Sequence, residues 1–163
     1  MHILVAESEA KIANFIRRGL MADGFGICLV FRVDELPPVN RVGKFNLLIA
    51  DVEIAGGDLL DYLHRLRREH PAFSVPVLVP EDLHCSPVSF LNAGADDYLT
   101  KPFSLTGLVK KVRKFLDRKK AAGRGFALLE YFLRHPNVVL TKQRIMDNIW
   151  NYDYSGMSNI IET

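Results

Sequence analysis

The stretch Phe45-Asn46-Leu47-Leu48-Ile49-Ala50-Asp51 decides the fold of this chain. Its apolar run is too short for a helix and predicts a buried strand that ends in an acid. In open α/β sheets, ligands and chemistry gather beyond the carboxyl ends of the strands. Asp51 is therefore a better candidate for a functional site than an ordinary surface acid.

Two other predicted strands end in charged residues that are candidate partners of Asp51. Ile3–Ala6 is followed by Glu7, and Tyr98–Thr100 is followed by Lys101. Because the carboxyl ends of parallel strands meet at one edge of a sheet, we expect two acids and one base to converge there.

Strand-like and helix-like stretches alternate along residues 1–118, which predicts an α/β fold with a five-stranded doubly wound parallel sheet. The predicted strands are Ile3–Ala6, Ile27–Phe31, Phe45–Ala50, Val75–Val79 and Tyr98–Thr100. The predicted helices, placed on both faces of the sheet, are Ala10–Met21, Leu59–His70, a short Pro87–Ala93 and a long basic Leu105–Arg118. One more helix is due around Pro37 and Pro38, but proline in a helix interior costs about 3 kcal/mol, so we expect it to be short or broken.

Composition bounds the size and the class of the protein. The chain has 163 residues, of which 48% are hydrophobic and 25% are charged, enough for one ordinary core and a small appendage. No apolar run approaches the roughly 18 residues of a membrane span, and no basic and apolar leader precedes the first strand. We therefore expect a cytoplasmic protein with no membrane partner. Cys28 and Cys85 are expected to be reduced thiols rather than metal ligands.

The last part of the chain is expected to form a small helical appendage. Residues 119–125, Lys-Lys-Ala-Ala-Gly-Arg-Gly, are rich in charge and glycine and indicate a linker. Beyond it, apolar spacing predicts two helices, Phe126–Arg134 and Lys142–Trp150. The net charge is −1 over residues 1–117 and +3 over 118–163, which fits either nucleic-acid contact or an ordinary solvated face.

One motif of eleven residues is highly specific: Ala93-Gly94-Ala95-Asp96-Asp97-Tyr98-Leu99-Thr100-Lys101-Pro102-Phe103. It is accompanied by Phe45–Asp51, by Asp58 and by the opening Ile3-Leu4-Val5-Ala6-Glu7. Together these residues resemble the receiver domain of response regulators, and the resemblance covers residues 1–118. It implies a flavodoxin-like sheet.

The resemblance also implies a role for each residue at the predicted edge of the sheet. Asp51 would be the phosphoacceptor, with a sensor histidine kinase as the phosphoryl donor. Glu7, Asp51 and the backbone carbonyl of Glu53 would hold Mg²⁺, and Lys101 would stabilise the phosphoryl charge. Pro102 corresponds to the family's fixed, commonly cis, peptide. The alternative for Lys101 is a structural ion pair with Asp51 and Glu7.

Two residues depart from the family's pattern in ways that weaken this site. The family has two adjacent acids after its first strand, whereas Glu7 is followed by Ser8, so Mg²⁺ should bind more weakly. The family's fourth strand ends in a hydroxyl residue that binds the phosphoryl group, whereas Glu81 stands there and would repel it. We therefore expect aspartyl phosphorylation to be weak or absent.

The resemblance further implies a switch residue and a dimer face. Tyr98 takes the place of the family's switch aromatic, and its alternative role is that of a packed strand residue. Asp96 and Asp97 before the fifth strand, with Lys111 and Arg113 on the last helix, match the charged face of the family's homodimers. A solvated basic face is the alternative.

The tail carries a second resemblance, on Phe126–Arg134, Val139–Lys142 and Ile149–Asn159. It resembles the winged-helix effector domain of OmpR/PhoB-type regulators, so residues 126–163 are expected to be a partial DNA-binding domain. The four-stranded platform and the wing are missing, and the stub from Ser158 is too short to read base edges in the major groove. Lys142 and Arg144 are expected to contact only DNA phosphates, which gives weak, sequence-blind binding.

These features predict a response regulator of a two-component signalling system that acts in transcription regulation. The alternative is a receiver-like dimerisation and interaction module that does not bind DNA. We expect no enzyme activity and no small-molecule substrate, because the chain has no nucleotide-binding glycine loop and no base dyad.

Overall fold

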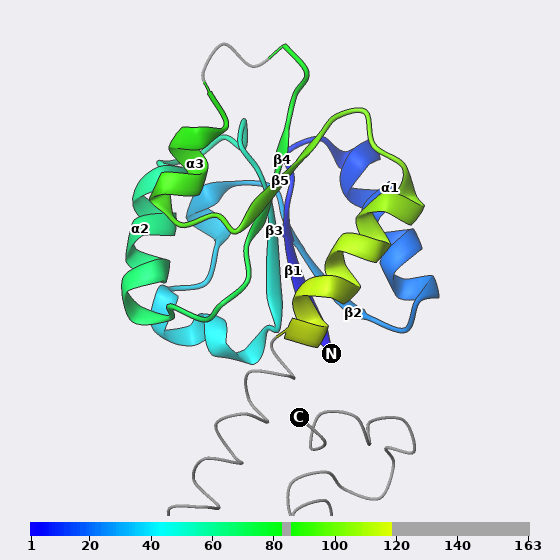
Figure 1. The fold of residues 1–163 in the computed structure, drawn as a ribbon, viewed down its shortest axis with the longest axis horizontal. Coiled ribbons are helices and arrows are strands. Elements are labelled where there is room, and N and C mark those ends of the chain that lie inside the picture. Colours follow the sequence, from blue (N-terminus) through cyan, green and yellow to red (C-terminus); the bar gives the residue numbers. More distant parts are fainter. Residues whose placement is uncertain (83–85, 119–163) are drawn as a thin grey trace, which may run out of the picture. The chain divides into compact units, whose positions relative to one another are not determined.

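The computed structural model describes residues 1–82 and 86–118 (Figure 1). The chain divides into two units, Met1–Leu116 and Asp117–Thr163. The predicted linker and C-terminal helices, with Lys142 and Arg144, lie outside the described residues. The predicted domain boundaries and the roles of these residues therefore stay predictions.

The first unit is built on a five-stranded, all-parallel sheet with the strand order β2-β1-β3-β4-β5, which confirms the predicted flavodoxin-like sheet. The strands are β1 (His2–Ala6), β2 (Gly26–Val30), β3 (Leu47–Asp51), β4 (Pro76–Val79) and β5 (Asp97–Thr100). The largest difference from the prediction is at Phe45, which lies outside β3. Its N–H donates to the carbonyl of Val42 (2.9 Å) and so closes the preceding 3₁₀ helix.

Helices cover both faces of the sheet (Figure 1). One face carries α1 (Ala10–Ala22) and a helix over 105–118, and the other carries α2 (Leu59–Glu69) and α3 (Val88–Ala93). Pro37 and Pro38 separate two short 3₁₀ helices, η1 (Val33–Glu35) and η2 (Val39–Lys44), which confirms the expected break. No helix in the described part of the chain is long and apolar enough to cross a membrane.

The central strands are buried on both sides because each face of the sheet carries its own apolar layer. Successive residues of a strand point to opposite faces. Leu47 and Ile49 of β3 accordingly join the core under α1 and the helix over 105–118, whereas Leu48 and Ala50 join the core under α2 and α3. All residues of β3 are buried, so Asp51 is held at the end of a rigid element.

Gly19 sets how closely α1 approaches the helix over 105–118. A Cβ atom at this position would lie 2.0 Å from Leu105 Cδ1, far inside van der Waals contact. The missing side chain therefore lets Leu105 pack against the backbone of α1, and the two helices form one layer over this face of the sheet.

Candidate functional site

Three charged side chains converge at the carboxyl edge of the sheet, as the strand ends predict. Lys101 Nζ lies 2.9 Å from Glu7 Oε2 and 3.1 Å from Asp51 Oδ2, so one ammonium group bridges two carboxylates. β1 and β3 are neighbours, whereas Lys101 follows β5 and reaches these acids across β4. The structural ion pair that was the alternative role of Lys101 is thus present.

Both carboxylates are removed from water: Glu7 is fully buried and Asp51 is 2% exposed. Burial raises the pKa of Glu7 and the charge of Asp51 adds to this rise, while the Glu9 N–H, 2.9 Å from Glu7 Oε1, and Lys101 oppose it. Burial acts to lower the pKa of Lys101, but its contact with Glu7 and the charge of Asp51 outweigh burial and raise that pKa. Lys101 is therefore a cation at neutral pH.

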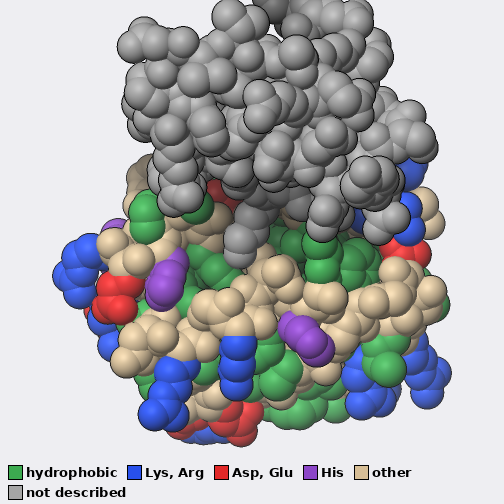
Figure 2. Space-filling view, turned by 90° about the horizontal axis from the view of Figure 1, so that it is seen from below, with side chains coloured by type: hydrophobic (Ala, Val, Ile, Leu, Met, Phe, Trp, Pro, Cys, Tyr) green, Lys and Arg blue, Asp and Glu red, His purple; other side chains and the backbone are tan. Residues whose placement is uncertain are grey.

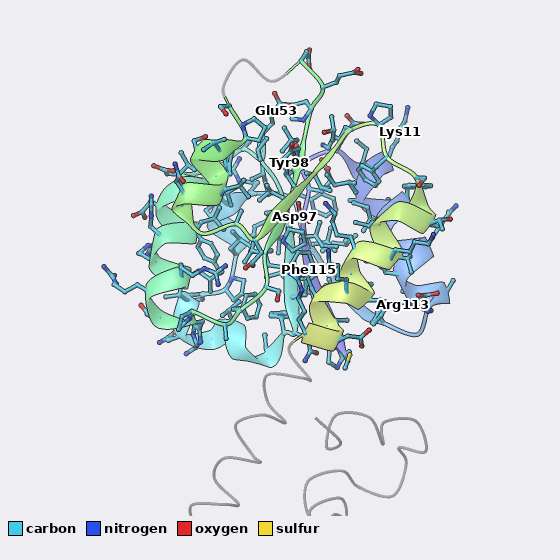
Figure 3. The ribbon with its side chains drawn as sticks, viewed as in Figure 1. Lys11, Glu53, Asp97, Tyr98, Arg113 and Phe115 are labelled. Atoms are coloured by element: carbon cyan, nitrogen blue, oxygen red, sulfur yellow. The ribbon has the colours of Figure 1, made fainter. Side chains whose placement is uncertain are left out.

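The two carboxylates fit a divalent cation, but with few ligands. Glu7 Oε2 is buried and accepts no hydrogen bond, so its only described partner is the charge of Lys101. Asp51 Oδ1 accepts one long hydrogen bond from the Glu53 N–H (3.3 Å), and Glu53 lies at the same edge of the sheet (Figure 3). Ser8 is exposed and adds no carboxylate. The described residues contain no cluster of three or more His, Cys, Asp or Glu able to hold a metal ion.

An open pocket of about 590 Å³ lies over Lys101, and it is lined by Ile12, Pro80, Glu81, Asp82, Lys101 and Pro102. Glu81 and Asp82 are exposed, so the expected hydroxyl position carries a carboxylate near the ammonium group. The Lys101–Pro102 peptide is cis, as the resemblance implied. The lining of this pocket therefore offers an anion one cation and two acids.

Tyr98 is not a packed strand residue, which corrects one of the two roles predicted for it. β5 lies at the edge of the sheet, and the Tyr98 side chain is 42% exposed. Its backbone carbonyl accepts a hydrogen bond from Lys111 Nζ. An edge strand has a neighbour on one side only, which leaves this aromatic ring uncovered. The switch role stays a prediction.

The four charges predicted to form a dimer face all have partners within the chain. Lys111 Nζ pairs with Asp97 (2.9 Å), and Arg113 pairs with Asp23 at the end of α1 (2.8 Å). Asp96 pairs instead with a residue of α2, on the other face of the sheet. A dimer through this face would therefore have to exchange internal ion pairs for external ones, and it stays a prediction.

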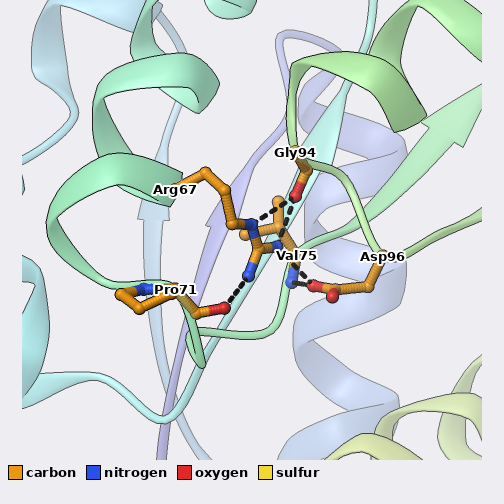
Figure 4. Close-up of polar contacts among 5 residues, drawn as sticks. All are labelled: Arg67, Pro71, Val75, Gly94 and Asp96. Atoms are coloured by element: carbon orange, nitrogen blue, oxygen red, sulfur yellow. Dashed lines mark hydrogen bonds and ion pairs between the residues drawn. The ribbon is translucent and has the colours of Figure 1, made fainter.

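Arg67 of α2 joins three segments, and its role was missed in the sequence (Figure 4). Its guanidinium donates to the carbonyls of Gly94 and Pro71 and to Asp96 Oδ2 (2.9 Å). The same Asp96 oxygen accepts from the Val75 N–H (2.6 Å) just before β4. Gly94 has φ +120°, and a Cβ there would lie 2.9 Å from Arg67 Cβ. We call these five residues the Arg67 clasp. Gly94 and Asp96, which follow the short helix α3, were the residues in the sequence from which it could have been predicted.

Comparisons with known proteins match both parts of the chain. Residues 3–113 match the response regulator receiver domain, and residues 118–163 match the C-terminal domain of transcriptional regulatory proteins. The uncharacterized transcriptional regulatory protein YkoG of Bacillus subtilis is 28% identical over 193 aligned residues, covering 99% of this chain and 85% of that protein. The response regulator MprA of Mycobacterium avium is also 28% identical, with 99% and 85% of the two chains covered.

Solved structures agree with the first match. The receiver domain of the Francisella response regulator 1452 has a TM-score of 0.62 at 28% identity, over 72% of this chain and 97% of that one. A CheY-like receiver domain from Methanospirillum hungatei has a TM-score of 0.65 at 21% identity, over 74% and 97%, and shows the same fold.

Proposed function

Because the chain belongs to the response regulators of two-component transcription regulation, we propose that Asp51 is its phosphoacceptor and that phosphorylation there is weak or absent. The observation that carries the proposal is the Lys101 bridge: a single ammonium group lies 2.9 Å from Glu7 and 3.1 Å from Asp51. Asp51 and Lys101 lie together as phosphoryl transfer requires, but the charge of Lys101 is already balanced by Glu7 and Asp51, which leaves less of it to stabilise a phosphoryl group.

The proposed chemistry is the transfer of a phosphoryl group from a sensor histidine kinase. An oxygen of Asp51 attacks phosphorus, the bond from phosphorus to the histidine nitrogen breaks, and an acyl phosphate forms. Lys101 would stabilise the negative charge of the phosphoryl group on Asp51, because its Nζ already lies within contact of Asp51 Oδ2. Asp51 is 2% exposed, so the donor has to reach it through the carboxyl edge of the sheet.

The charge balance explains why this transfer is expected to be weak. Glu7, Asp51 and Lys101 together carry one net negative charge, and a phosphoryl group adds about 1.5 to 2 more at pH 7. Receiver domains typically bind Mg²⁺ at this site, where it neutralises phosphoryl oxygens. Here Glu7, Asp51 and the Glu53 carbonyl would hold that ion, and Ser8 supplies no second acid beside Glu7. Glu81 adds another negative charge near Lys101.

The region that matches the DNA-binding domain, residues 118–163, is shorter than the corresponding part of its relatives, which supports reduced contact with DNA. The alignment with YkoG extends over 193 residues, more than the 163 residues of this chain, so part of the relative has no counterpart here. We propose that this part, which falls inside the aligned region, includes the platform of the winged helix. Lys142 and Arg144 would contact DNA phosphates, and a homodimer through Asp97 and Lys111 would bring two such sets of contacts to one duplex.

The test is phosphorylation of the 163-residue chain by acetyl phosphate over a range of Mg²⁺ concentrations, read by intact mass, with Asp51→Asn as the control. We expect a partial adduct that requires high Mg²⁺ and is absent from Asp51→Asn. A complete adduct at low Mg²⁺ would contradict weak phosphorylation. An equal adduct on Asp51→Asn would reject Asp51 as the acceptor.

A gel-shift assay separates the proposed regulator from a pure interaction module. The regulator should shift duplex DNA in a salt-sensitive manner. No shift at any salt concentration, together with a stable dimer, would favour the module.

A further inference from the structure

The face of the sheet opposite α2 and α3 is covered by two helices that present one shared outer surface. α1 and the helix over 105–118 meet at Gly19 and Leu105, and Arg113 pairs with Asp23 (2.8 Å) farther along. The ring of Phe15 on α1 and that of Phe103, two residues before the other helix, have centroids 6.3 Å apart. The two helices are therefore in contact over about two turns, and their outward side chains form a continuous surface.

Four exposed cations occupy this surface: Lys11 and Arg18 on α1, and Lys110 and Lys114 on the other helix. We call them the basic face. Lys11 and Arg18 are seven residues apart and Lys110 and Lys114 are four apart, so each pair lies on one side of its helix. None of the four has a carboxylate within ion-pair distance among residues 1–82 and 86–118. Their charge is therefore not neutralised internally.

The basic face is positive although the domain as a whole is not, because residues 1–117 have a net charge of −1. Other exposed cations without an ion pair among the described residues, such as Arg17, Arg41 and Arg68, are spread over α1, η2 and α2. Figure 3 labels Lys11 at the carboxyl edge, the same end of the molecule as Glu53, and Arg113 toward the other end of the helical layer. Figure 2 shows the opposite edge of the sheet, where Lys and Arg side chains lie toward the outer rims. The molecule is electrostatically uneven.

We propose that the basic face binds the phosphate backbone of duplex DNA and adds a receiver-borne contact to that of the effector domain. Duplex DNA carries one negative charge per about 1.7 Å, which complements a row of unpaired cations. The helix that carries Lys110 and Lys114 runs without a break in sequence to residue 118, where the match to the transcriptional regulatory domain begins. Because the two matched regions are joined in one chain, DNA bound by the second would be present at high effective concentration for the first. This inference rests on the proposed DNA binding.

The experiment measures binding of a fluorescent non-specific duplex by anisotropy at several salt concentrations, using the full 163-residue chain. Lys110→Ala with Lys114→Ala removes two positive charges from the basic face. Each lost phosphate contact reduces the slope of log Kobs against log salt by about 0.9, so the slope should fall by about two. Lys11→Ala with Arg18→Ala should do the same.

The matched control is Arg41→Ala with Arg68→Ala, which removes two exposed positive charges from η2 and α2. This variant should retain the wild-type slope. An equal loss in the control and in the basic-face variant would overturn the proposal, because net charge alone would then explain the effect. DNA binding with an unchanged slope in both basic-face variants would overturn it as well, while leaving the effector domain's DNA contact intact.

A separate arm tests another polyanion. If vesicles with anionic lipid bind through Lys110 and Lys114 but duplex DNA does not bind the wild-type chain, the basic face is a membrane contact and the proposal is wrong. Phosphorylation of Asp51, read by mass, is independent of all these outcomes.

Discussion

Replacement of Lys101 by methionine tests the bridge at the centre of the site. The substitution keeps most of the side-chain volume but removes the charge that lies 2.9 Å from Glu7 and 3.1 Å from Asp51. Breaking a buried ion pair by removal of one partner costs about 3–5 kcal/mol, because it leaves an uncompensated buried charge. The Lys101 side chain is 17% exposed, which admits some water, so we expect the lower end, about 3 kcal/mol at pH 7.5.

The loss should depend on pH in a defined direction. Burial raises the pKa of Glu7 above its ordinary 4.5, so the folded protein binds this proton more tightly than the unfolded chain does. Protonation of Glu7 as the pH falls therefore favours folding and removes the repulsion that Lys101→Met exposes. The deficit of Lys101→Met should shrink as the pH falls from 7.5 toward the raised pKa of Glu7. In the wild type, the raised pKa of Lys101 gives stability that is present below 10.5 and lost above its folded-state pKa.

Urea unfolding followed by circular dichroism at pH 7.5 and pH 5.5 measures this loss. The control is Lys114→Met, which removes an exposed and unpaired charge and should change stability by less than about 0.5 kcal/mol. Addition of Glu7→Gln to Lys101→Met should recover at least half of the loss at pH 7.5. Equal stability of Lys101→Met and the control at both pH values would refute the reasoning.

Three further substitutions test other parts of the structure. Ser8→Asp should tighten Mg²⁺ binding by about tenfold, measured by calorimetry, because it returns a carboxylate ligand beside Glu7. Gly19→Ala should lower stability to urea by about 1–3 kcal/mol, because its Cβ would lie 2.0 Å from Leu105 Cδ1. Arg67→Ala should lower stability by about 1–2 kcal/mol, because it leaves Asp96 and two carbonyls without their cationic donor.

Each of these substitutions has a control within the chain. Gly43→Ala adds the same atom where nothing lies within 4 Å, so it should leave stability nearly unchanged. Arg68→Ala removes a neighbouring exposed arginine and should be close to neutral. Equal losses in Gly19→Ala and Gly43→Ala would contradict the close packing of Leu105 on α1, and equal losses in Arg67→Ala and Arg68→Ala would contradict the Arg67 clasp. Unchanged Mg²⁺ affinity in Ser8→Asp would contradict the assignment of Ser8 to the metal pocket.

The sheet and the site could be predicted because both depend on local patterns. A continuous apolar run such as that before Asp51 is typical of a strand buried on both faces, and parallel strands bring their carboxyl ends together. The convergence of Glu7, Asp51 and Lys101 follows from those two facts. The proline pair likewise predicted the break that separates η1 from η2.

The contacts that could not be predicted depend on which elements become neighbours in space. Arg67 and Asp96 are 29 residues apart, and no periodicity joins them. The exposure of Tyr98 depends on β5 being an edge strand, which strand spacing alone does not fix. The pairing of Arg113 with Asp23 joins residues 90 apart and requires that the two helices share one face of the sheet.

The Arg67 clasp has a consequence for how related chains are classified. Gly94 and Asp96 belong to the most specific signature of the family, yet in this molecule they hold the framework together rather than take part in phosphoryl transfer. Folding alone therefore requires this half of the signature, whether or not Asp51 accepts a phosphoryl group. A match to that signature identifies the architecture of a receiver, and the residues beside Asp51, above all Ser8 after Glu7, are the better place to judge its chemistry.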